Sequence, residues 1–329
     1  MKKRKRATTI TEDQAEDRVV TTDVNSTLLY MISEKKLRSY TLPVAIAAGL
    51  LFHNFLSSYR FLVPYLLFGM MFFTCSKISI KQVRLHPMHG ILLSFQIIAG
   101  IALYLIFRPI NEELAQGLMI CVFAPVATAS PVVGGLLGAN VTMMTTYVLI
   151  SNSVVALLAP LFFSLIMPES DITFITSFLQ ISKSTLLILI LPIVVSLFMK
   201  RYTPKGFEVV RKLQPVSFYL WAVCMMVLIG STIHTIIIQG SSNYIMEVIM
   251  VTGALIICII QFTLGRKLGT KYGDMVAGRQ MMGQKNTGVA IWLAMAYLTP
   301  MSTLAPTAYI IWQNLMNSYE IWKDTRKKQ

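Results

Sequence analysis

A run of polar residues interrupts an apolar stretch near the C-terminal end of the chain. The run comprises Gln284, Lys285, Asn286 and Thr287, with Gly283 before it and Gly288 after it. A charged side chain inside a membrane span is costly and usually marks a functional site. Lys285 lies about nine residues, or ~13 Å, into this stretch, too deep for easy snorkelling to the interface. We therefore predict an intramembrane positive charge; the alternative is a later span start, with Lys285 in a loop.

A second interruption lies between residues 121 and 135. Pro125 and Pro131 each remove a backbone donor and clash with the preceding turn, and two glycines follow. Thr128 and Ser130 lie between the prolines. Backbone groups freed at membrane depth must line a polar cavity or find partners on neighbouring segments. The alternative interpretation is a simple proline kink.

Together the two interruptions favour an anionic ligand. Unwound helices near the bilayer midplane present half-helix N-termini, whose partial positive charge attracts anions. The Lys285 ammonium would add a full positive charge. No Asp or Glu falls within the predicted fourth, fifth or ninth spans, although a cation carrier would normally need one. The sequence thus favours a negatively charged substrate.

Ten apolar runs would position these segments. The chain has 329 residues, of which 55% are hydrophobic, and a mean hydropathy of +0.62. A helix needs ~20 mostly apolar residues to cross a bilayer. The predicted spans are 41–57, 61–77, 88–107, 114–137, 140–167, 176–199, 214–238, 243–265, 276–298 and 302–321. The four cysteines lie in or beside these runs without metal-ligand spacing, so we predict no metal site and no cofactor.

The net charge of +14 indicates topology rather than nucleic-acid binding, because no soluble basic domain exists to hold a nucleic acid. Lysine and arginine concentrate in the N-terminal segment, the tail and alternate connections, whereas the opposite connections carry Glu112, Glu113, Glu169 and Asp171. This pattern predicts a multi-pass protein of the plasma membrane with both termini in the cytoplasm. Residues 1–40 are predicted as a polar, partly disordered extension, with a surface helix over 26–38. The transporter domain is predicted over 41–321 and a basic tail over 322–329.

The count of ten spans suggests an internal repeat. Five spans per half would invert the second half relative to the first, and inverted repeats with paired broken helices are common in secondary transporters. The interruptions fall in the fourth and ninth spans, which are matching positions. We therefore predict an all-α polytopic membrane protein of ten transmembrane helices in two inverted five-helix repeats.

The interrupted segments resemble those of the bile acid:sodium symporter family. The likeness extends over residues 41–321, and its motifs are Thr128-Ala129-Ser130, Gly138-Ala139-Asn140, Leu158-Ala159-Pro160 and Gly283-Gln284-Lys285-Asn286-Thr287-Gly288. The resemblance implies a panel domain of spans 1, 2, 6 and 7 and a core domain of spans 3–5 and 8–10. The broken fourth and ninth helices would cross in the core.

The resemblance also implies a function and site residues. Substrates of this family are organic anions, either carboxylates or sterol-like acids. Thr128 and Asn286 fall where the family contacts its substrate, and we add the adjacent Ser130 and Thr287. Gln96 aligns loosely with a glutamine that faces a sodium site.

The chain departs from the family at the sodium ligands. The family's ninth-helix glutamate is matched by Met281, its motif glutamine by Lys285 and its fourth-helix asparagine by Pro131, whereas Ser130 is retained. Two fifth-helix hydroxyls align with Met144 and Val148. This pattern argues against sodium coupling of the family type. We hypothesise that the Lys285 ammonium takes the place of a sodium ion, in a charge site shared with Gln284, Ser130 and Gln96.

Uniport, exchange and proton coupling then become candidates, with a small organic anion and the lipid bilayer as the expected partners. The alternatives are a sodium-coupled symporter with relocated ligands and a membrane sensor without transport activity. We do not expect an enzyme, because the chain has no HExxH sequence, Asp-rich motif or serine elbow. The sequence predicts no particular oligomeric state.

Overall fold

The computed structural model describes residues 41, 43–76, 83–166, 173–239 and 244–327. The predicted extension over 1–40, with its surface helix, lies outside these ranges. The chain divides into two compact units, residues 1–47 and 48–329. In the first unit the described residues, Thr41 and 43–47, are helical.

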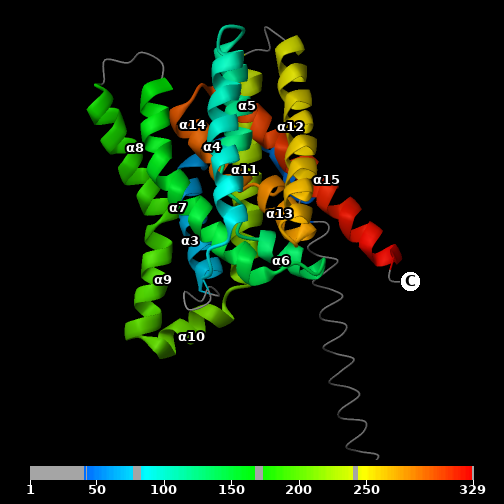
Figure 1. Ribbon diagram of the computed structural model, residues 1–329. Helices are drawn as coiled ribbons and strands as arrows, with labels where there is room; N and C mark the ends of the chain where they lie inside the picture. Colours follow the sequence, from blue (N-terminus) through cyan, green and yellow to red (C-terminus); the bar gives the residue numbers. More distant parts are fainter. Residues whose placement is uncertain (1–40, 42, 77–82, 167–172, 240–243, 328–329) are drawn as a thin grey trace, which may run out of the picture. The chain divides into compact units, whose positions relative to one another are not determined.

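The described part of the second unit is helical, apart from turns, short irregular connections and one isolated bridge (Figure 1). Its helices up to the chain's midpoint are α2 (His53–Ser57), η1 (Arg60–Leu62), α3 (Val63–Cys75), α4 (Pro87–Phe107), α5 (Glu112–Phe123), α6 (Ser130–Leu136) and α7 (Val141–Ile166). Those that follow are α8 (Phe174–Leu189), α9 (Leu191–Tyr202), α10 (Pro204–Lys212), α11 (Val216–Gln239), α12 (Tyr244–Lys271), α13 (Met275–Gly283), α14 (Thr287–Tyr297), η3 (Pro300–Thr303) and α15 (Leu304–Lys327).

The multi-pass membrane character is confirmed. By length and composition α4, α7, α11 and α12 can each cross a membrane, and α8 with α9 can do so as a pair bent by 42°. Pro192 in the first turn of α9 accounts for the bend, because proline cannot donate to the preceding helix. The shorter apolar helices include residues 60–75 and α14. Each predicted span from the second onward overlaps a helix or a pair of helices, but length and composition identify four or five spans rather than ten.

Two helical segments were not predicted from the sequence. The basic connection between the predicted sixth and seventh spans contains α10, and α15 continues six residues beyond the predicted end of the last span at residue 321. In both places a polar, charged composition concealed helical structure.

Side-chain caps determine where several helices begin. Asn111 caps α5, Thr173 caps α8, Asp274 caps α13 and Asn286 caps α14, each accepting a hydrogen bond from a first-turn amide. Such caps satisfy donors that no helical partner can reach. The residue just before each of these four helices therefore determines where the helix starts.

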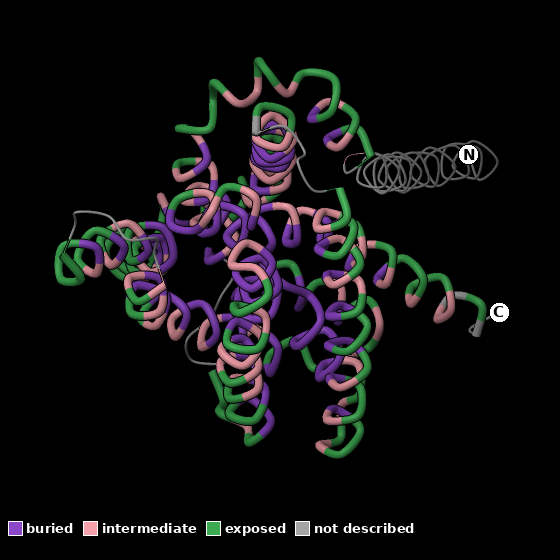
Figure 2. The backbone as a smooth tube through the Cα atoms, turned by 90° about the horizontal axis from the view of Figure 1, so that it is seen from above, coloured by how far each residue is buried: buried purple, intermediate pink, exposed green. Residues whose placement is uncertain are grey.

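The core lies among α4, α5, α7, α12, α13 and α15. One apolar cluster joins α4, α5, α12 and α15, and another joins α4, α7 and α13. Buried positions concentrate in these inner helices, and exposed positions follow the outward faces of the others (Figure 2). Large apolar side chains are also exposed on the outward faces of the inner helices, among them Ile98 on α4, Leu157 on α7 and Ile245 on α12. Lipid tails would cover them in a bilayer.

Glycines bring α12 and α13 into backbone contact. A Cβ on Gly278 would lie 2.5 Å from both the carbonyl oxygen of Gly265 and the Cα of Gly269. The hairpin between the two helices turns at Gly273, whose φ of +86° favours glycine. This close approach fixes the position of α13 and of the break that follows it.

Candidate functional site

The two polar interruptions form breaks within paired helices. α5 ends at Phe123 and α6 begins at Ser130, while α13 ends at Gly283 and α14 begins at Thr287. Pro125 lies in the first break, whereas Pro131 lies in the first turn of α6, where its missing N–H has no helical acceptor to lose. A non-helical segment therefore connects α5 to α6, and a second one connects α13 to α14.

These two non-helical segments pair with each other. Val126 and Lys285 form an isolated antiparallel bridge. The amide of Ala127 donates to the carbonyl of Gln284 over 2.9 Å, and the amide of Asn286 donates to the carbonyl of Pro125 over 2.7 Å. Each break thus supplies partners for the backbone groups that the other exposes.

Side chains from the following long helices hold both segments. On α7, the Ser151 hydroxyl accepts from the amide of Val126 over 3.2 Å, and the Asn152 amide group donates to the Val126 carbonyl over 3.2 Å. On α15, Gln313 Oε1 accepts from the amide of Lys285 over 2.9 Å. Each residue of the bridge is therefore anchored by the next long helix, α7 for Val126 and α15 for Lys285.

The Lys285 side chain caps the C-terminal end of α5. It is 2% exposed, and its ammonium donates to the carbonyl of Val122 over 2.8 Å. The last carbonyls of a helix carry partial negative charge and lack helical donors. A cation at this point is electrostatically favoured, and it satisfies an acceptor that would otherwise be unpaired.

Two glutamines complete the capping of α5. Gln96 on α4 donates to the carbonyls of Phe123 and Ala124 over 2.8 and 3.1 Å. Gln261 on α12 donates to the carbonyl of Cys121 over 3.3 Å. Side-chain donors from α4, from α12 and from the segment between α13 and α14 therefore surround the end of α5. Gln96 thus contacts the end of α5, and its role at a sodium site stays a prediction.

The remaining predicted site residues lie in the two breaks or at the helix ends beside them, and most are buried. Ser130 is fully buried, and its hydroxyl has no partner within the described part of the chain. The same holds for Gln284 Oε1 and for the side-chain amide nitrogen of Asn286. Thr287 accepts from Gln313 over 3.5 Å, whereas Thr128 is only half-buried. Of the four predicted substrate contacts, Thr128 is the most accessible.

Gly283 and Gly288 serve close packing. Gly283 ends α13 against the ring of Phe262, and a Cβ on Gly288 would lie 3.0 Å from Met225 Cε on α11. Gly288 belongs to the first turn of α14 rather than to the break itself.

Several polar residues that contact the two breaks were not predicted from the sequence. Gln261, Gln313 and Asn152 each contact a non-helical segment or the end of α5. Each lies within a predicted span, where an unpaired polar side chain is costly. That cost was a usable signal: every mid-span Gln or Asn needs a partner, and an unwound backbone can provide one.

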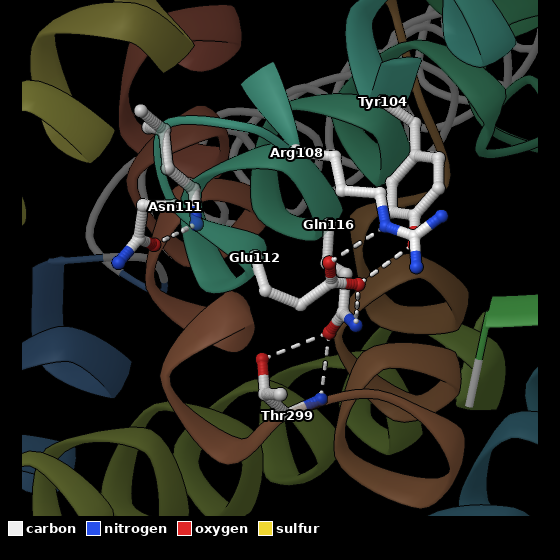
Figure 3. A network of polar contacts seen from close by, with 7 residues as sticks. Tyr104, Arg108, Asn111, Glu112, Gln116 and Thr299 are labelled. Carbon is white, nitrogen blue, oxygen red and sulfur yellow. Dashed lines mark hydrogen bonds and ion pairs between the residues drawn. The ribbon is translucent and has the colours of Figure 1, made fainter. Parts of the chain in front are cut away.

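At one end of the core, a polar network ties the α4–α5 corner to the segment after α14 (Figure 3). Glu112 accepts from the hydroxyl of Tyr104 over 2.8 Å and from Gln116 over 2.9 Å, and it pairs with Arg108 at 3.5 Å. Gln116 Oε1 accepts from both the amide and the hydroxyl of Thr299 over 2.8 Å. This network, the Glu112 clasp, fixes the start of α5 relative to the end of α14.

A smaller clasp joins α13 to the α6–α7 connection. Asp274 Oδ1 accepts from the amide of Ala277 over 2.8 Å, and its Oδ2 accepts from the amide of Asn140 over 2.7 Å. The side chain of Asn140 in turn accepts from the amide of Met143 in the first turn of α7. The Asp274 clasp therefore fixes the start of α13 relative to the end of α6.

We expect Asp274→Ala to lower the free energy of unfolding by about 1–2 kcal/mol through the lost helix cap, with a further loss from the unpaired amide of Asn140. Asp274→Asn keeps the oxygen that caps α13 but turns a donor toward Asn140, so its loss should be intermediate. Thermal unfolding of the detergent-solubilised protein gives the order. An alanine variant as stable as the native chain would show that the clasp does not hold α13.

Comparison with protein-family models gives one match. The model described as the sodium bile acid symporter family aligns with residues 63–239, from the start of α3 to the end of α11, and this range includes the first break. A comparison with curated proteins finds no significant match. The aligned range covers more than half of the 329 residues, and the family is the one that the interrupted segments resemble. The chain therefore belongs to the sodium bile acid symporter family.

Proposed function

We propose that the protein is a secondary transporter of the plasma membrane that carries a small organic anion, either a carboxylate or a sterol-like acid, by alternating access. Family membership supports a transporter, because the members of this family transport solutes. We further propose that it does not use the family's usual sodium sites. The observation that supports sodium independence is that the buried Lys285 ammonium donates a hydrogen bond to the carbonyl of Val122.

The argument for sodium independence is electrostatic. The end of α5 presents carbonyl oxygens at membrane depth, where a positive charge is needed for compensation. The ammonium supplies that charge from within the chain and already occupies the position beside Val122. A sodium ion bound next to it would be repelled by a like charge in a medium of low dielectric constant. Exchange, uniport and proton coupling are then the candidate modes of transport.

We also propose ten spans arranged as two inverted repeats with panel and core domains and cytoplasmic termini. The corresponding places of the two breaks support this. Val126 and Lys285 pair with each other, and each is held by a side chain of the next long helix. Gln96 and Gln261, which both reach the end of α5, lie in the predicted third and eighth spans.

The proposed substrate contacts are Thr128, Ser130, Asn286 and Thr287. The N-terminus of α14 begins here, and its cap residue Asn286 retains a side-chain N–H group without an acceptor among the described residues. An anionic group can accept from such donors. Thr128 is the half-buried member of the set, so a substrate would meet it first.

Counterflow in proteoliposomes tests the proposal. Vesicles preloaded with an unlabelled anion should take up the same labelled anion equally fast in sodium chloride and in potassium chloride, with a bile acid and a short carboxylate as the first two probes. Thr128→Val should lower uptake about tenfold or more, since a hydrogen bond to a charged group contributes about 1.5–3 kcal/mol. The unfolding midpoint should not change, because the Thr128 hydroxyl makes no hydrogen bond within the described residues.

The matched control is Thr270→Val, which makes the same chemical change at an exposed position near the end of α12. Its uptake should equal that of the native chain. Equal uptake by the Thr128 and Thr270 variants would remove Thr128 from the substrate site. Binding of either probe without counterflow would instead indicate the non-transporting sensor.

A sodium-coupled symporter with relocated ligands is the second candidate, favoured by the family itself. Gln284 Oε1 and Asn152 Oδ1 are buried near the two breaks without donors in the described part of the chain, and oxygens of this kind can bind a hard cation. Uptake that requires sodium would establish this candidate. Uptake that instead responds to a pH gradient would identify the proton as the coupling ion.

A further inference from the structure

The short helix α10 is fastened to the end of α9. The chain turns at Thr203, whose carbonyl accepts from the amide of Phe207 over 2.9 Å. Phe207 is the buried residue of α10, and the ammonium of Lys200 lies 5.9 Å from its ring centroid. α10 therefore has a defined inward face, and its position at the lower end of α9 is visible in Figure 1.

Five cations gather on this corner, on exposed positions: Lys200, Arg201, Lys205, Arg211 and Lys212. The single carboxylate of the same stretch belongs to Glu208, which pairs with Arg211 at 3.0 Å. Within the described residues, the other four cations have no ion pair. We call these five residues the basic corner. The positive charge of the basic corner favours binding of an anionic partner.

An exposed apolar edge runs beside the basic corner. Val209 and Leu213 are 57% and 46% exposed, although both are fully apolar. At the end of α9, Phe198 and Tyr202 are also exposed, with ring centroids 4.5 Å apart. Aromatic side chains at the end of a span are typical of the membrane interface. A basic helix with such an edge is suited to lie in the headgroup region.

We infer that the basic corner is a binding site for anionic phospholipid of the cytoplasmic leaflet. The lipid phosphates would accept from Lys205, Lys212 and the cations at the end of α9, while Val209 and Leu213 would reach the acyl boundary. The cations are spread along two helices rather than around an enclosed cavity, so they match a row of headgroups better than one small soluble anion. Anionic lipids make the cytoplasmic leaflet negative, which agrees with the predicted orientation.

The test is native mass spectrometry of the detergent-solubilised full chain, titrated with phosphatidylserine or with phosphatidylcholine. We expect the native chain to bind phosphatidylserine at least tenfold more tightly. The triple variant Lys205→Gln, Arg211→Gln, Lys212→Gln should lose most of this preference. Three cations that each contribute fully would account for roughly a hundredfold. Glycerophosphoserine, the headgroup without acyl chains, should not compete, because the apolar edge is part of the site.

The matched control is the tail variant Lys323→Gln, Arg326→Gln, Lys327→Gln, which removes three cations from a segment predicted to lie on the same side of the membrane. It should keep the preference for phosphatidylserine. The inference is overturned if the α10 variant keeps its preference, if the tail variant loses as much, or if glycerophosphoserine displaces the lipid. Unchanged unfolding midpoints of both variants exclude misfolding as the cause. The outcome is independent of the transported substrate.

Discussion

Lys285→Ala is expected to lower the free energy of unfolding by about 3 kcal/mol. Removing the ammonium leaves the buried carbonyl of Val122 without its donor, which costs about 1–3 kcal/mol. Truncating a fully buried side chain also opens a cavity, and comparable truncations cost about 2–5 kcal/mol. Relief from holding a desolvated ammonium offsets part of this sum. Thermal unfolding of the purified protein measures the net effect.

Two comparisons separate the role of the charge from that of packing. Lys285→Met keeps much of the side-chain volume and removes the charge, so its loss should be about 1–2 kcal/mol, from the unpaired carbonyl alone. The native chain should unfold at the same temperature in sodium chloride and in potassium chloride. A ligand at a hundredfold excess over its Kd would stabilise by about 2.7 kcal/mol. A higher midpoint of the native chain in sodium would therefore refute the replacement of sodium by Lys285.

Gly278→Ala should be among the most damaging single changes in the chain, with a loss of about 3 kcal/mol or more. The added Cβ would lie 2.5 Å from backbone atoms of Gly265 and Gly269 on α12. Neither neighbour has a side chain that could move aside, so α13 itself must shift, and with it the break that it supports. The same substitution at an unhindered helical site gains about 0.5–1 kcal/mol. The steric clash is therefore the reason why the substitution should destabilise the protein rather than stabilise it. Thermal unfolding and uptake should both fall.

Gly90→Ala on α4 is the matched control. A Cβ at Gly90 meets nothing within 4 Å, so the substitution should be neutral or stabilise by up to about 1 kcal/mol. Similar losses at the two positions would show that the contact between α12 and α13 is looser than described.

The elements of the site were largely predictable, because the cost of polar groups in a membrane appears directly in the sequence. Proline at 125 and the polar run after Gly283 predicted two interruptions, and the helices end at Phe123 and at Gly283. Lys285 is buried rather than on a loop surface, as expected from its depth in the span. The family, too, was predicted from these segments and is confirmed.

The contacts at the site were not predictable, because many of the partners are backbone groups. The acceptor for Lys285 is the carbonyl of Val122, and no side-chain pattern marks a carbonyl as unpaired. The donors Gln96 and Gln261 are separated by 165 positions in the sequence, yet they meet at the end of one helix. α10 was missed for another reason: its sequence is rich in charged residues and follows a predicted span, which is typical of a loop, although Pro204 marks its start.

The pairing of Val126 with Lys285 makes the two breaks inseparable. Closing the first break into a continuous helix would withdraw the carbonyl of Pro125 from the amide of Asn286 and the amide of Ala127 from the carbonyl of Gln284. The second segment would then hold unsatisfied groups with no water to replace the lost bonds. Making only one of the two helices continuous would therefore destabilise the protein, although an unbroken helix is the more stable local structure. In descendants of this sequence, the two interruptions should be retained together or lost together.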